Sequence, residues 1–490
     1  MKLGKIINVD SSLSEIKIKG ISDDSRMVRR RELFFIIERR NFDIFSVLRS
    51  IEPKISAFVA DCKNKQGVEK IIKHKPIIFV KDVRKEFYKA VDTFYEFQNF
   101  NLKTIGITGT NGKTTTAFLI HHLLKSLGQN PSLIGTVKYL IGDIEQSAGY
   151  TTPDFLNLRK ILKKIKNKGS NFLVMEVSSH ALAQQRVKGV EFSRCVFTNL
   201  TRDHLDYHKT MEKYFKEKKK LFLQNKKAIS IINADDFYGK KIFKEVNNRL
   251  SYGLDKGLDF RANNIRLNGS SSCFDLVRGR RSYSVRTHLC GRHNISNILA
   301  AVGVVSSLGF PIQEIIKSLG EFKGVDGRLQ TVNEDVFIDY AHTPDALGNT
   351  LKALRDVGYE KIICVFGCGG NRDKGKRKAM GQIADKQADF TFITSDNPRD
   401  EDAKAICQQI AKGFKGNSYS IVVDRKRAIS QAIKLFLLIG SMYQANKAKK
   451  KTCLLVAGKG HEDYQIVGNR KLAFKDSKAI NQAIKEIIYN

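Results

Sequence analysis

The stretch TIGITGTNGKTTT (Thr104–Thr116) decides the fold of this chain. Its apolar start, Thr104–Thr108, predicts a buried strand, a glycine-rich turn follows, and Thr114–Leu127 has the apolar spacing of a helix that ends at Gly128. Backbone N–H groups at such a helix start bind anions, and glycine lets phosphate approach them closely. The stretch therefore predicts a phosphate-binding loop, although Ile107 stands where the usual Walker spacing requires glycine.

The residue types in this turn suit triphosphate binding. Gly109 and Gly112 leave the backbone accessible, and Lys113 places a positive charge beside the outer phosphates. The Thr114 hydroxyl is positioned to bind Mg²⁺. A plain surface turn is the alternative, but a Gly-Lys-Thr-Thr run between a strand and a helix favours an ATP site.

The composition is that of a soluble globular protein with several domains. At 490 residues, 42% hydrophobic and 28% charged, the chain exceeds one ordinary core, which predicts two to four domains. No apolar run approaches membrane-spanning length and no secretory signal is visible, so we expect a cytoplasmic protein without membrane insertion. The eight scattered cysteines fit reduced thiols.

The net charge of +35 attracts anions of every kind, including nucleic acid, acidic lipid and nucleotides. The basic residues are spread widely, and no nucleic-acid recognition motif accompanies them. We therefore expect a small polyanionic substrate and no nucleic-acid partner.

The order of apolar segments indicates an α/β protein with a mostly parallel sheet. Phe172–Val177 and Val196–Asn199 are further predicted strands, and domain boundaries are expected near Phe100 and within Phe322–Gln330. Three short apolar segments before the first boundary suit a small α/β unit: Leu33–Ile37, Ala57–Ala60 and Ile77–Val80.

After the second boundary, four predicted strands each run into a polar loop, the place where open α/β sheets bind ligands. Ordinary surface turns are the alternative, but they do not explain the Arg, His and Glu residues in these loops. We therefore expect one shared site. The strands are Val336–Asp339, Lys361–Phe366, Phe390–Thr394 and Cys453–Ala457.

Six motifs occur together along the chain: TGTNGKTTT (Thr108–Thr116), EVSSHAL (Glu176–Leu182), TNLTRDHLDYH (Thr198–His208), DYAHTPDAL (Asp339–Leu347), DNPR (Asp396–Arg399) and GKGHEDYQ (Gly458–Gln465). In this combination the sequence resembles the Mur ligases, and among them the members that add meso-diaminopimelate. The resemblance covers nearly the whole chain. It implies a small N-terminal α/β uridine-binding domain at 1–100, a central P-loop-type ATP-binding domain with a mostly parallel sheet at 101–325, and a C-terminal Rossmann-like amino-acid-binding domain at 326–490.

The same resemblance implies an ATP-dependent amide-bond ligase of peptidoglycan precursor synthesis. The D-Glu carboxylate of UDP-N-acetylmuramoyl-L-Ala-D-Glu would take the γ-phosphoryl group of ATP, and the amine of meso-diaminopimelate would displace phosphate from the acyl phosphate. Lys113 and two Mg²⁺ ions would neutralise charge. We expect a monomer whose partners are these small molecules.

The site residues that the resemblance implies fall into four groups. For ATP they are Gly109, Thr110, Asn111, Gly112, Lys113, Thr114, Thr115, Asn294, Arg328 and Asp339. For the UDP-N-acetylmuramoyl dipeptide they are Ser25, Arg40, Asn41, Thr151, Thr152, Ser178, Gln184 and Arg186. For meso-diaminopimelate they are Arg372, Asp396, Asn397, Pro398, Arg399, Gly458 and Glu462. Mg²⁺ would be held by Thr114, Glu176, His204 and carbamylated Lys218, and the catalytic residues would be Lys113, Lys218 and His204.

Two of these residues have structural alternatives. Glu176 ends an apolar strand, and a buried carboxylate needs a partner, so a buried salt bridge is the alternative to metal binding. His204 alone would be interpreted as a satisfied core histidine. The resemblance instead implies one Mg²⁺ at Thr114 and Glu176, and a second at His204.

The segment EKYFKEKKKLF (Glu212–Phe222) has the pattern of a solvated basic helix. The resemblance implies that the lysine four positions after Tyr214, which is Lys218, is carbamylated by CO₂ and interacts with Mg²⁺. Carbamylation needs a neutral amine, which neighbouring cations favour.

The DNPR motif is expected to set the choice of amino acid. Meso-diaminopimelate differs from lysine by a second carboxylate, and an arginine fork binds a carboxylate bidentately. Arg399 fits that task with help from Arg372, and Glu462 would take the distal ammonium group near Gly458. A surface salt bridge is the alternative role for Arg399.

The chain departs from the family pattern at several positions. Tyr150, His293 and Asp326 stand where the family has Asn, Phe and Pro. In the loop IERRNFDIF, a Gly and a later Asp-Gly are replaced by Arg39, Asp43 and Ile44.

Three other functions remain to be weighed. A lysine-adding or folylpolyglutamate synthetase-like ligase is disfavoured by DNPR and GKGHED. A basic P-loop ATPase that binds nucleic acid would show salt-sensitive DNA binding. An inactive relative is disfavoured because every proposed metal and phosphate residue is present.

Overall fold

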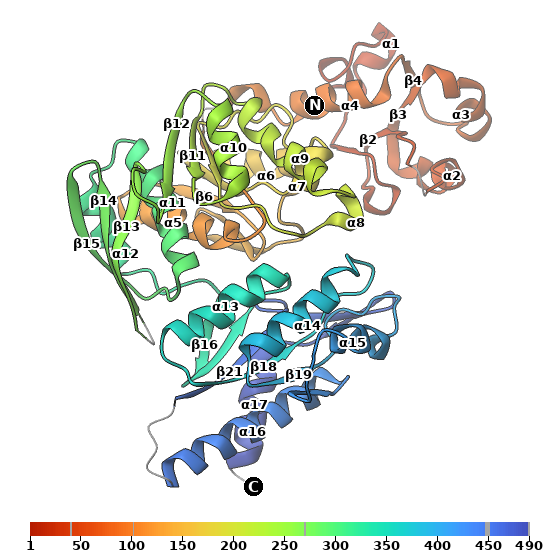
Figure 1. Cartoon of the computed structure of the whole chain (residues 1–490). Coiled ribbons are helices and arrows are strands. Elements are labelled where there is room, and N and C mark those ends of the chain that lie inside the picture. The colour runs from red at the N-terminus through yellow and green to blue at the C-terminus, as the bar shows by residue number, and fades with distance from the viewer. Residues whose placement is uncertain (40–41, 101, 269–270, 446–450, 489–490) are drawn as a thin grey trace. The chain divides into compact units, whose positions relative to one another are not determined.

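The computed structural model describes residues 1–39, 42–100, 102–268, 271–445 and 451–488 (Figure 1). The chain forms two compact units. The first holds Met1–Leu102, Pro153–Asn171 and Gln184–Gly189. The second holds Lys103–Thr152, Phe172–Ala183 and Val190–Asn490.

The first unit is built on a parallel sheet with the strand order β1-β2-β3-β4. Successive side chains of a strand point to opposite faces. Leu33 and Phe35 accordingly join a cluster with two helices, and Phe34 joins a different cluster on the other face. The elements are β1 (Gly20–Ser22), β2 (Glu32–Phe35), β3 (Ile55–Asp61), β4 (Ile77–Val80), α1 (Ser11–Ser14), α2 (Leu48–Ile51), α3 (Lys65–Ile71), α4 (Val83–Phe94) and α6 (Phe155–Asn167). The predicted small α/β unit is confirmed.

Helix α6 belongs to this unit through a buried arginine. Arg159 is fully buried, and its Nε donates to Asp92 Oδ1 on α4 at 2.7 Å. Its guanidinium group also lies 3.6 Å from the Phe97 ring centroid. Removing one member of such a buried pair leaves an uncompensated charge, so this contact holds the α6 segment against α4.

The second unit contains two larger sheets in the part of the chain that the structure describes. The first has the order β15-β14-β13-β12-β11-β10-β5-β9-β6-β7-β8. Its strands are β5 (Lys103–Thr108), β6 (Pro131–Ile134), β7 (Lys138–Ile141), β8 (Ile144–Ser147), β9 (Phe172–Glu176), β10 (Arg194–Phe197), β11 (Ile229–Asn233), β12 (Arg249–Gly253), β13 (Phe260–Asn268), β14 (Ser271–Arg278) and β15 (Arg281–Thr287). Its helices are α5 (Lys113–Ser126), α7 (Ser179–Ala183), α8 (Leu205–His208), α9 (Met211–Leu223), α10 (Phe237–Glu245), α11 (Arg292–Ser307) and α12 (Ile312–Leu319).

The centre of this sheet is parallel, as predicted, and both edges are antiparallel. The run from β6 to β13 pairs in parallel, whereas β13–β14–β15 and β6–β7–β8 pair as antiparallel meanders. Strand β5 lies between β10 and β9, so the phosphate loop that follows it lies near the middle of the sheet.

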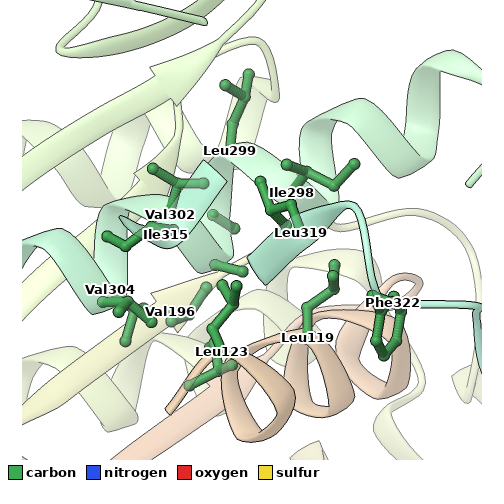
Figure 2. Close-up of a cluster of buried hydrophobic side chains, with 14 of the residues drawn as sticks. Leu119, Leu123, Val196, Ile298, Leu299, Val302, Val304, Ile315, Leu319 and Phe322 are labelled. Carbon is green, nitrogen blue, oxygen red and sulfur yellow. The ribbon is translucent and has the colours of Figure 1, made fainter. Parts of the chain in front are cut away.

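Helices cover both faces of this sheet. Val196 of β10 packs into the cluster formed by α5, α11 and α12, which Figure 2 shows with Leu119, Leu123, Ile298 and Leu319 among its members. The next residue, Phe197, points to the opposite face and lies 6.2 Å from the Phe222 ring of α9. The sheet is therefore a buried layer between two layers of helices.

The second larger sheet has the order β16-β17-β21-β18-β19-β20 and is parallel except for β16. Cys364 and Ile363 of β18 face different clusters, one with α13–α15 and the other with α16 and α17. The strands are β16 (Gln330–Asn333), β17 (Val336–Asp339), β18 (Lys361–Phe366), β19 (Phe390–Ile393), β20 (Tyr419–Ile421) and β21 (Thr452–Ala457). The strands β22 (Tyr464–Val467) and β23 (Arg470–Ala473) form a separate two-stranded sheet. The helices are α13 (Pro344–Asp356), α14 (Lys376–Gln387), α15 (Ala403–Ala411), α16 (Arg425–Ala445) and α17 (Asp476–Ile488). The four predicted strands of this region are confirmed.

Across the described ranges, no helix combines the length and the apolar character needed to cross a bilayer.

Candidate functional site

The cavity at the phosphate loop lies within the second unit and has a volume of about 330 Å³. One wall is the loop between β5 and α5, and another is the segment from Arg328 to His342. The sequence-predicted residues that line it are Thr110, Asn111, Gly112, Lys113, Thr114, Thr115, Thr151, Glu176, Ser178, His204, Asn294, Arg328 and Asp339. The structure therefore brings most of the predicted ATP and metal residues to one place.

The glycine-rich turn continues directly into α5. Gly112 precedes the helix with a φ of 84°, in the left-handed region that favours glycine. A side chain at Gly112 would overlap with the amide of Asn297 on α11. The absence of a side chain keeps the first N–H groups of the helix accessible to an anion.

Two lysines bond to the backbone of this turn. Lys113 Nζ donates to the carbonyl oxygens of Gly109 and Thr110 at 3.0 and 2.8 Å, and burial lowers its pKa. Lys218 Nζ donates to the same Gly109 oxygen at 2.6 Å. Burial, and then the charge of Lys113, hold the pKa of Lys218 well below its ordinary value.

The burial of Lys218 corrects the interpretation of its helix as a solvated face. Lys218 is 1% exposed because α9 turns this side toward the phosphate loop. Its neighbours are partly exposed and form ion pairs: Lys219 pairs with Glu245, and Lys220 pairs with Glu217. The aliphatic part of the Lys218 side chain is buried, and its amine lies beside that of Lys113.

The predicted strand Val196–Asn199 ends two residues earlier, at Phe197. Thr198 Oγ1 donates to the Asn111 carbonyl oxygen at 2.6 Å, and Asn199 Oδ1 accepts from the Asn111 amide at 2.9 Å. These two residues leave the sheet ladder because their side chains bind the phosphate loop.

Glu176 lies fully buried at the end of β9. Its carboxylate accepts from Thr114 Oγ1 at 3.1 Å, from the Thr136 amide at 2.8 Å and from Thr136 Oγ1 at 3.0 Å. Within the described ranges no salt bridge to Glu176 occurs, so hydroxyl and amide donors satisfy this carboxylate in place of the buried salt bridge weighed above.

His204 lies beside a buried carboxylate that the sequence analysis did not single out. His204 Nε2 is 3.3 Å from Asp203 Oδ2, and His342 Nε2 and Lys376 Nζ approach the same carboxylate at 3.7 and 3.9 Å. Burial lowers the pKa of His204 to about 3, so its imidazole is neutral and keeps a free lone pair. Its side chain is 37% exposed, which rules out a core histidine.

No group of three or more His, Cys, Asp and Glu side chains suited to a metal ion occurs in the portions of the chain that are described. The predicted metal residues differ from such a group, because Thr114 contributes a hydroxyl and Lys218 an amine.

The segment between the two large sheets contacts the phosphate loop. Arg328 Nη2 donates to Thr114 Oγ1 at 3.0 Å, and its guanidinium carbon lies 4.5 Å from the Tyr340 ring centroid. Asp339 accepts from the Leu329 amide at 2.6 Å, and burial raises its pKa. Asn294 lies at the start of α11 and lines the cavity from the other side.

The loops after β17, β19 and β21 meet around Glu462. Its Oε2 accepts from Asn397 Nδ2 and from Lys459 Nζ, each at 2.9 Å, and its Oε1 accepts from Tyr340 at 3.4 Å. Gly458, with a φ of 108°, donates to the Asp339 carbonyl oxygen at 3.0 Å. These three strand-end loops therefore lie in contact with one another, and the shared ligand site stays a prediction.

Arg399 lies beside Arg372 at the edge of this loop cluster. Both side chains border Gly369, and Arg399 Nη1 donates to the Gly370 carbonyl oxygen at 2.8 Å. Burial, and then the charge of Arg372, lower the pKa of Arg399. No salt bridge to either arginine occurs among the residues described, so the surface salt bridge weighed for Arg399 is absent. The Pro398 carbonyl lies so close to Gly370 that a side chain there would overlap with it.

Three of the predicted dipeptide residues lie together in the second unit. Thr152 Oγ1 donates to the Glu176 carbonyl oxygen at 2.8 Å and accepts from the Ser178 amide at 3.1 Å. Thr151 Oγ1 lies 3.1 Å from Thr136 Oγ1. The three hydroxyls therefore lie next to the buried Glu176.

The other predicted dipeptide residues belong to the first unit. Ser25 begins a short 3-10 turn, and Arg186 Nε and Nη2 donate to Gln184 Oε1 at 3.0 and 2.8 Å. Arg40 and Asn41 lie outside the described residues.

Sequence reasoning missed Asp203, Thr136, Asn297 and Lys459. Asp203 and Lys459 stand inside motifs that were quoted, next to His204 and within GKGHED, so attention to their charge could have found them. Thr136 and Asn297 carry no signal of their own, because only folding brings them to the loop.

Comparisons with known proteins agree on one family. The Mur ligase middle-domain family model matches residues 107–305, and the Mur ligase glutamate ligase domain matches residues 327–460. A curated UDP-N-acetylmuramoyl-L-alanyl-D-glutamate–2,6-diaminopimelate ligase 1 from Clostridium acetobutylicum is 39% identical over 500 residues, covering 99% of this chain and 100% of that one. The ligase of the same activity from Aquifex aeolicus is 38% identical over 489 residues, covering 99% and 96%.

Solved structures show the same likeness over the full length. A UDP-N-acetylmuramoyl-L-alanyl-D-glutamate–2,6-diaminopimelate ligase has a TM-score of 0.65 at 29% identity, and each chain is covered completely. A MurF ligase from Thermotoga maritima in complex with ADP has a TM-score of 0.64 at 18% identity, covering 96% of this chain and 97% of that one, which shows the shared fold.

Proposed function

Because the chain belongs to the Mur ligase family, we propose that it is an ATP-dependent ligase that joins meso-2,6-diaminopimelate to UDP-N-acetylmuramoyl-L-Ala-D-Glu. The observation that carries the amino-acid choice is the arginine pair at the strand ends. Arg399 and Arg372 stand without a carboxylate partner in the described ranges, in the same loop cluster as Glu462. A cationic pair near a carboxylate is what an amino acid with a second carboxylate and a distal ammonium requires.

The phosphate loop supplies the ATP end of the site. The helix start at Gly112 offers N–H groups, and Lys113 and Lys218 bring two amines to the Gly109 carbonyl. The N–H groups together with the charge of Lys113 fit a triphosphate. Asn294, Arg328 and Asp339 complete the nucleotide site, with Thr110, Asn111, Thr114 and Thr115 from the loop itself. Gly109 begins that loop.

Chemically, the side chains would act mainly by position and charge. Transfer of a phosphoryl group needs the acceptor carboxylate held in line with the γ-phosphate and the developing charge neutralised. Lys113 can release its backbone bonds and pair with the transferring group, and Arg328, already at Thr114, lies within the same cavity. The D-Glu carboxylate becomes an acyl phosphate, and the diaminopimelate amine then displaces phosphate.

The oxygen-rich surroundings of Glu176 fit Mg²⁺. Thr114 Oγ1 and Glu176 Oε2 lie 3.1 Å apart, and hydroxyl and carboxylate oxygens are the ligands that Mg²⁺ prefers. The neutral imidazole of His204 can bind a second ion. When bound, Mg²⁺ would neutralise phosphate charge during transfer.

The proposal includes a carbamate on Lys218. A buried lysine without a carboxylate partner is costly as a cation, and its neutral form reacts with CO₂ to give a negatively charged group. The amine lies next to Lys113, so a carbamate would compensate that charge and could face Mg²⁺.

The other binding roles follow the same division of the chain. Residues 1–100 bind the uridine end through Ser25, Arg40 and Asn41; residues 101–325 bind ATP; residues 326–490 bind the amino acid. Thr151, Thr152, Ser178, Gln184 and Arg186 hold the muramoyl dipeptide. Asp396, Asn397, Pro398 and Gly458 shape the amino-acid pocket with Arg372, Arg399 and Glu462. The enzyme acts in the cytoplasm as a monomer.

Phosphate release with one substrate omitted at a time tests this function. Release should require ATP, the UDP-linked dipeptide and meso-diaminopimelate together, and single-stranded DNA should not stimulate it. Release that is indifferent to the dipeptide but stimulated by DNA would support the nucleic-acid-dependent ATPase instead.

A further inference from the structure

A second cavity lies at the antiparallel edge of the large sheet, with a volume of about 730 Å³. It is formed by the ends of β12, β13, β14 and β15 and by the start of α12 (Figure 1). Leu250, Tyr283 and Ile312 provide apolar wall. Among the described residues, it shares no lining residue with the cavity at the phosphate loop.

Four arginines line this second cavity: Arg261, Arg278, Arg280 and Arg281. In the described part of the chain, none of them forms a salt bridge. Arg278 Nη1 donates to the neutral Ser306 Oγ at 2.7 Å. The one acidic lining residue, Asp259, is committed elsewhere, since its Oδ2 accepts from the amide and hydroxyl of Ser251 at 2.7 and 2.6 Å.

The strand register places two of these arginines opposite each other. Arg278 and Arg281 are directly opposite each other in the β14–β15 ladder, joined by the turn at Gly279 and Arg280. Like charges in directly opposed positions of an antiparallel pair are destabilising. An anion held between them would remove that repulsion, because guanidinium forks bind phosphate oxygens bidentately.

We propose that this cavity binds a phosphorylated anion of about nucleotide size that carries two or more negative charges. The four guanidinium groups hold the phosphates, and Leu250, Tyr283 and Ile312 contact the apolar part of the ligand. The cavity volume lies in the range of about 300–1,000 Å³ that is typical of small-molecule sites. The same phosphate chemistry occurs in free metabolites and in lipid headgroups, so the test separates these sources.

Calorimetric titration of the full-length protein with inorganic tripolyphosphate tests the proposal. The wild type should bind one molecule at the phosphate loop and one in this cavity. The variant Arg280→Gln/Arg281→Gln should lose the second class of binding or weaken it by at least about tenfold. Circular dichroism melting of the variant checks that it is folded.

The matched control is Arg266→Gln/Arg286→Gln, which removes two exposed charges from β13 and β15 outside the cavity lining. This control should keep both binding classes. A loss as large as that of Arg280→Gln/Arg281→Gln would show that total charge, and not the cavity, attracts the anion, and would overturn the proposal.

Co-sedimentation with phosphatidylglycerol vesicles, compared with phosphatidylcholine vesicles, identifies the source of the phosphate. Vesicle binding that needs Arg280 and Arg281 assigns the site to a lipid headgroup. Tripolyphosphate binding without vesicle binding assigns it to a free phosphorylated molecule. If neither probe distinguishes Arg280→Gln/Arg281→Gln from the wild type, the proposal is wrong.

Discussion

Lys218 Nζ and Lys113 Nζ donate to the same carbonyl oxygen, that of Gly109, at 2.6 and 3.0 Å. Burial lowers the pKa of both lysines, and the charge of Lys113 lowers the pKa of Lys218 further. The phosphate loop is thus bordered by a lysine from a helix a hundred residues further along the chain. This relationship connects the loop with the proposed carbamate.

Lys218→Gln should lower kcat by about 10²-fold or more, because it removes the group that is proposed to carry the carbamate and face Mg²⁺. Lys218→Glu should retain more activity than Lys218→Gln, since it supplies a permanent carboxylate. Steady-state phosphate release measures both variants, and NMR with ¹³C-bicarbonate detects the carbamate carbon directly.

Lys219→Gln is the matched control for Lys218. Lys219 lies on the same helix and pairs with Glu245 at its surface, so its loss should leave kcat nearly unchanged. Full activity of Lys218→Gln at low bicarbonate and low Mg²⁺ would contradict the carbamate proposal.

Gly370→Ala should raise the KM for meso-diaminopimelate by about ten- to hundredfold and leave the KM for ATP nearly unchanged. The new side chain would overlap with the Pro398 carbonyl and displace the DNPR loop, which is far from the phosphate loop in sequence. Gly370 has no positive φ, so the effect is steric. Initial rates at varied concentrations of each substrate measure the two constants.

Gly416→Ala is the control for this substitution, because no atom of the described residues lies within 4 Å of a Cβ at that position. Its KM values should equal those of the wild type. Equal increases of both KM values in Gly370→Ala would show that the disturbance is not confined to the DNPR loop and would refute the local interpretation.

The positions of the strands in the second larger sheet could be predicted from the sequence, and buried polar positions could not. The ranges Val336–Asp339 and Lys361–Phe366 were correct because uninterrupted apolar runs of that length are typical of parallel strands covered on both faces. The antiparallel edges were missed, because the pairing direction of an edge strand depends on long-range contacts that local pattern does not record.

Site residues that stand in sequence motifs could be predicted. Site residues that only tertiary contacts bring together were missed. Glu176 and Arg399 were found because they stand in motifs. The burial of Lys459 within GKGHED could not be foreseen, because lysine is almost always solvated and its position is explained by its contacts with Glu462 and Asn397. The arginine-lined cavity was equally hidden, since the β14–β15 register alone brings Arg278 and Arg281 together.

Acid should destabilise the protein partly through His121 on α5. Burial, and then the charge of Lys125, lower the pKa of His121 from 6.5 to about 4. Between these pH values His121 binds a proton in the unfolded chain but not in the folded chain. Its titration therefore costs no free energy of unfolding above pH 6.5, and the free energy of unfolding decreases as the pH falls toward 4. At pH 5 the loss from this group is about 2 kcal/mol.

His121→Phe should remove this part of the loss, so that its free energy of unfolding decreases by about 2 kcal/mol less than that of the wild type between pH 7 and pH 5. Urea unfolding followed by circular dichroism measures the difference. The adjacent substitution His122→Gln keeps His121 and should retain the wild-type decrease. An identical decrease in His121→Phe and the wild type would show that His121 does not contribute.

The most direct test of the central claim compares meso-diaminopimelate with lysine as the amine substrate. With the wild type, kcat/KM for phosphate release should favour meso-diaminopimelate by at least about 10²-fold, and Arg399→Lys should remove most of that preference while changing the weak lysine reaction little. A wild-type preference for lysine, or a preference for meso-diaminopimelate that survives Arg399→Lys unchanged, would contradict the account.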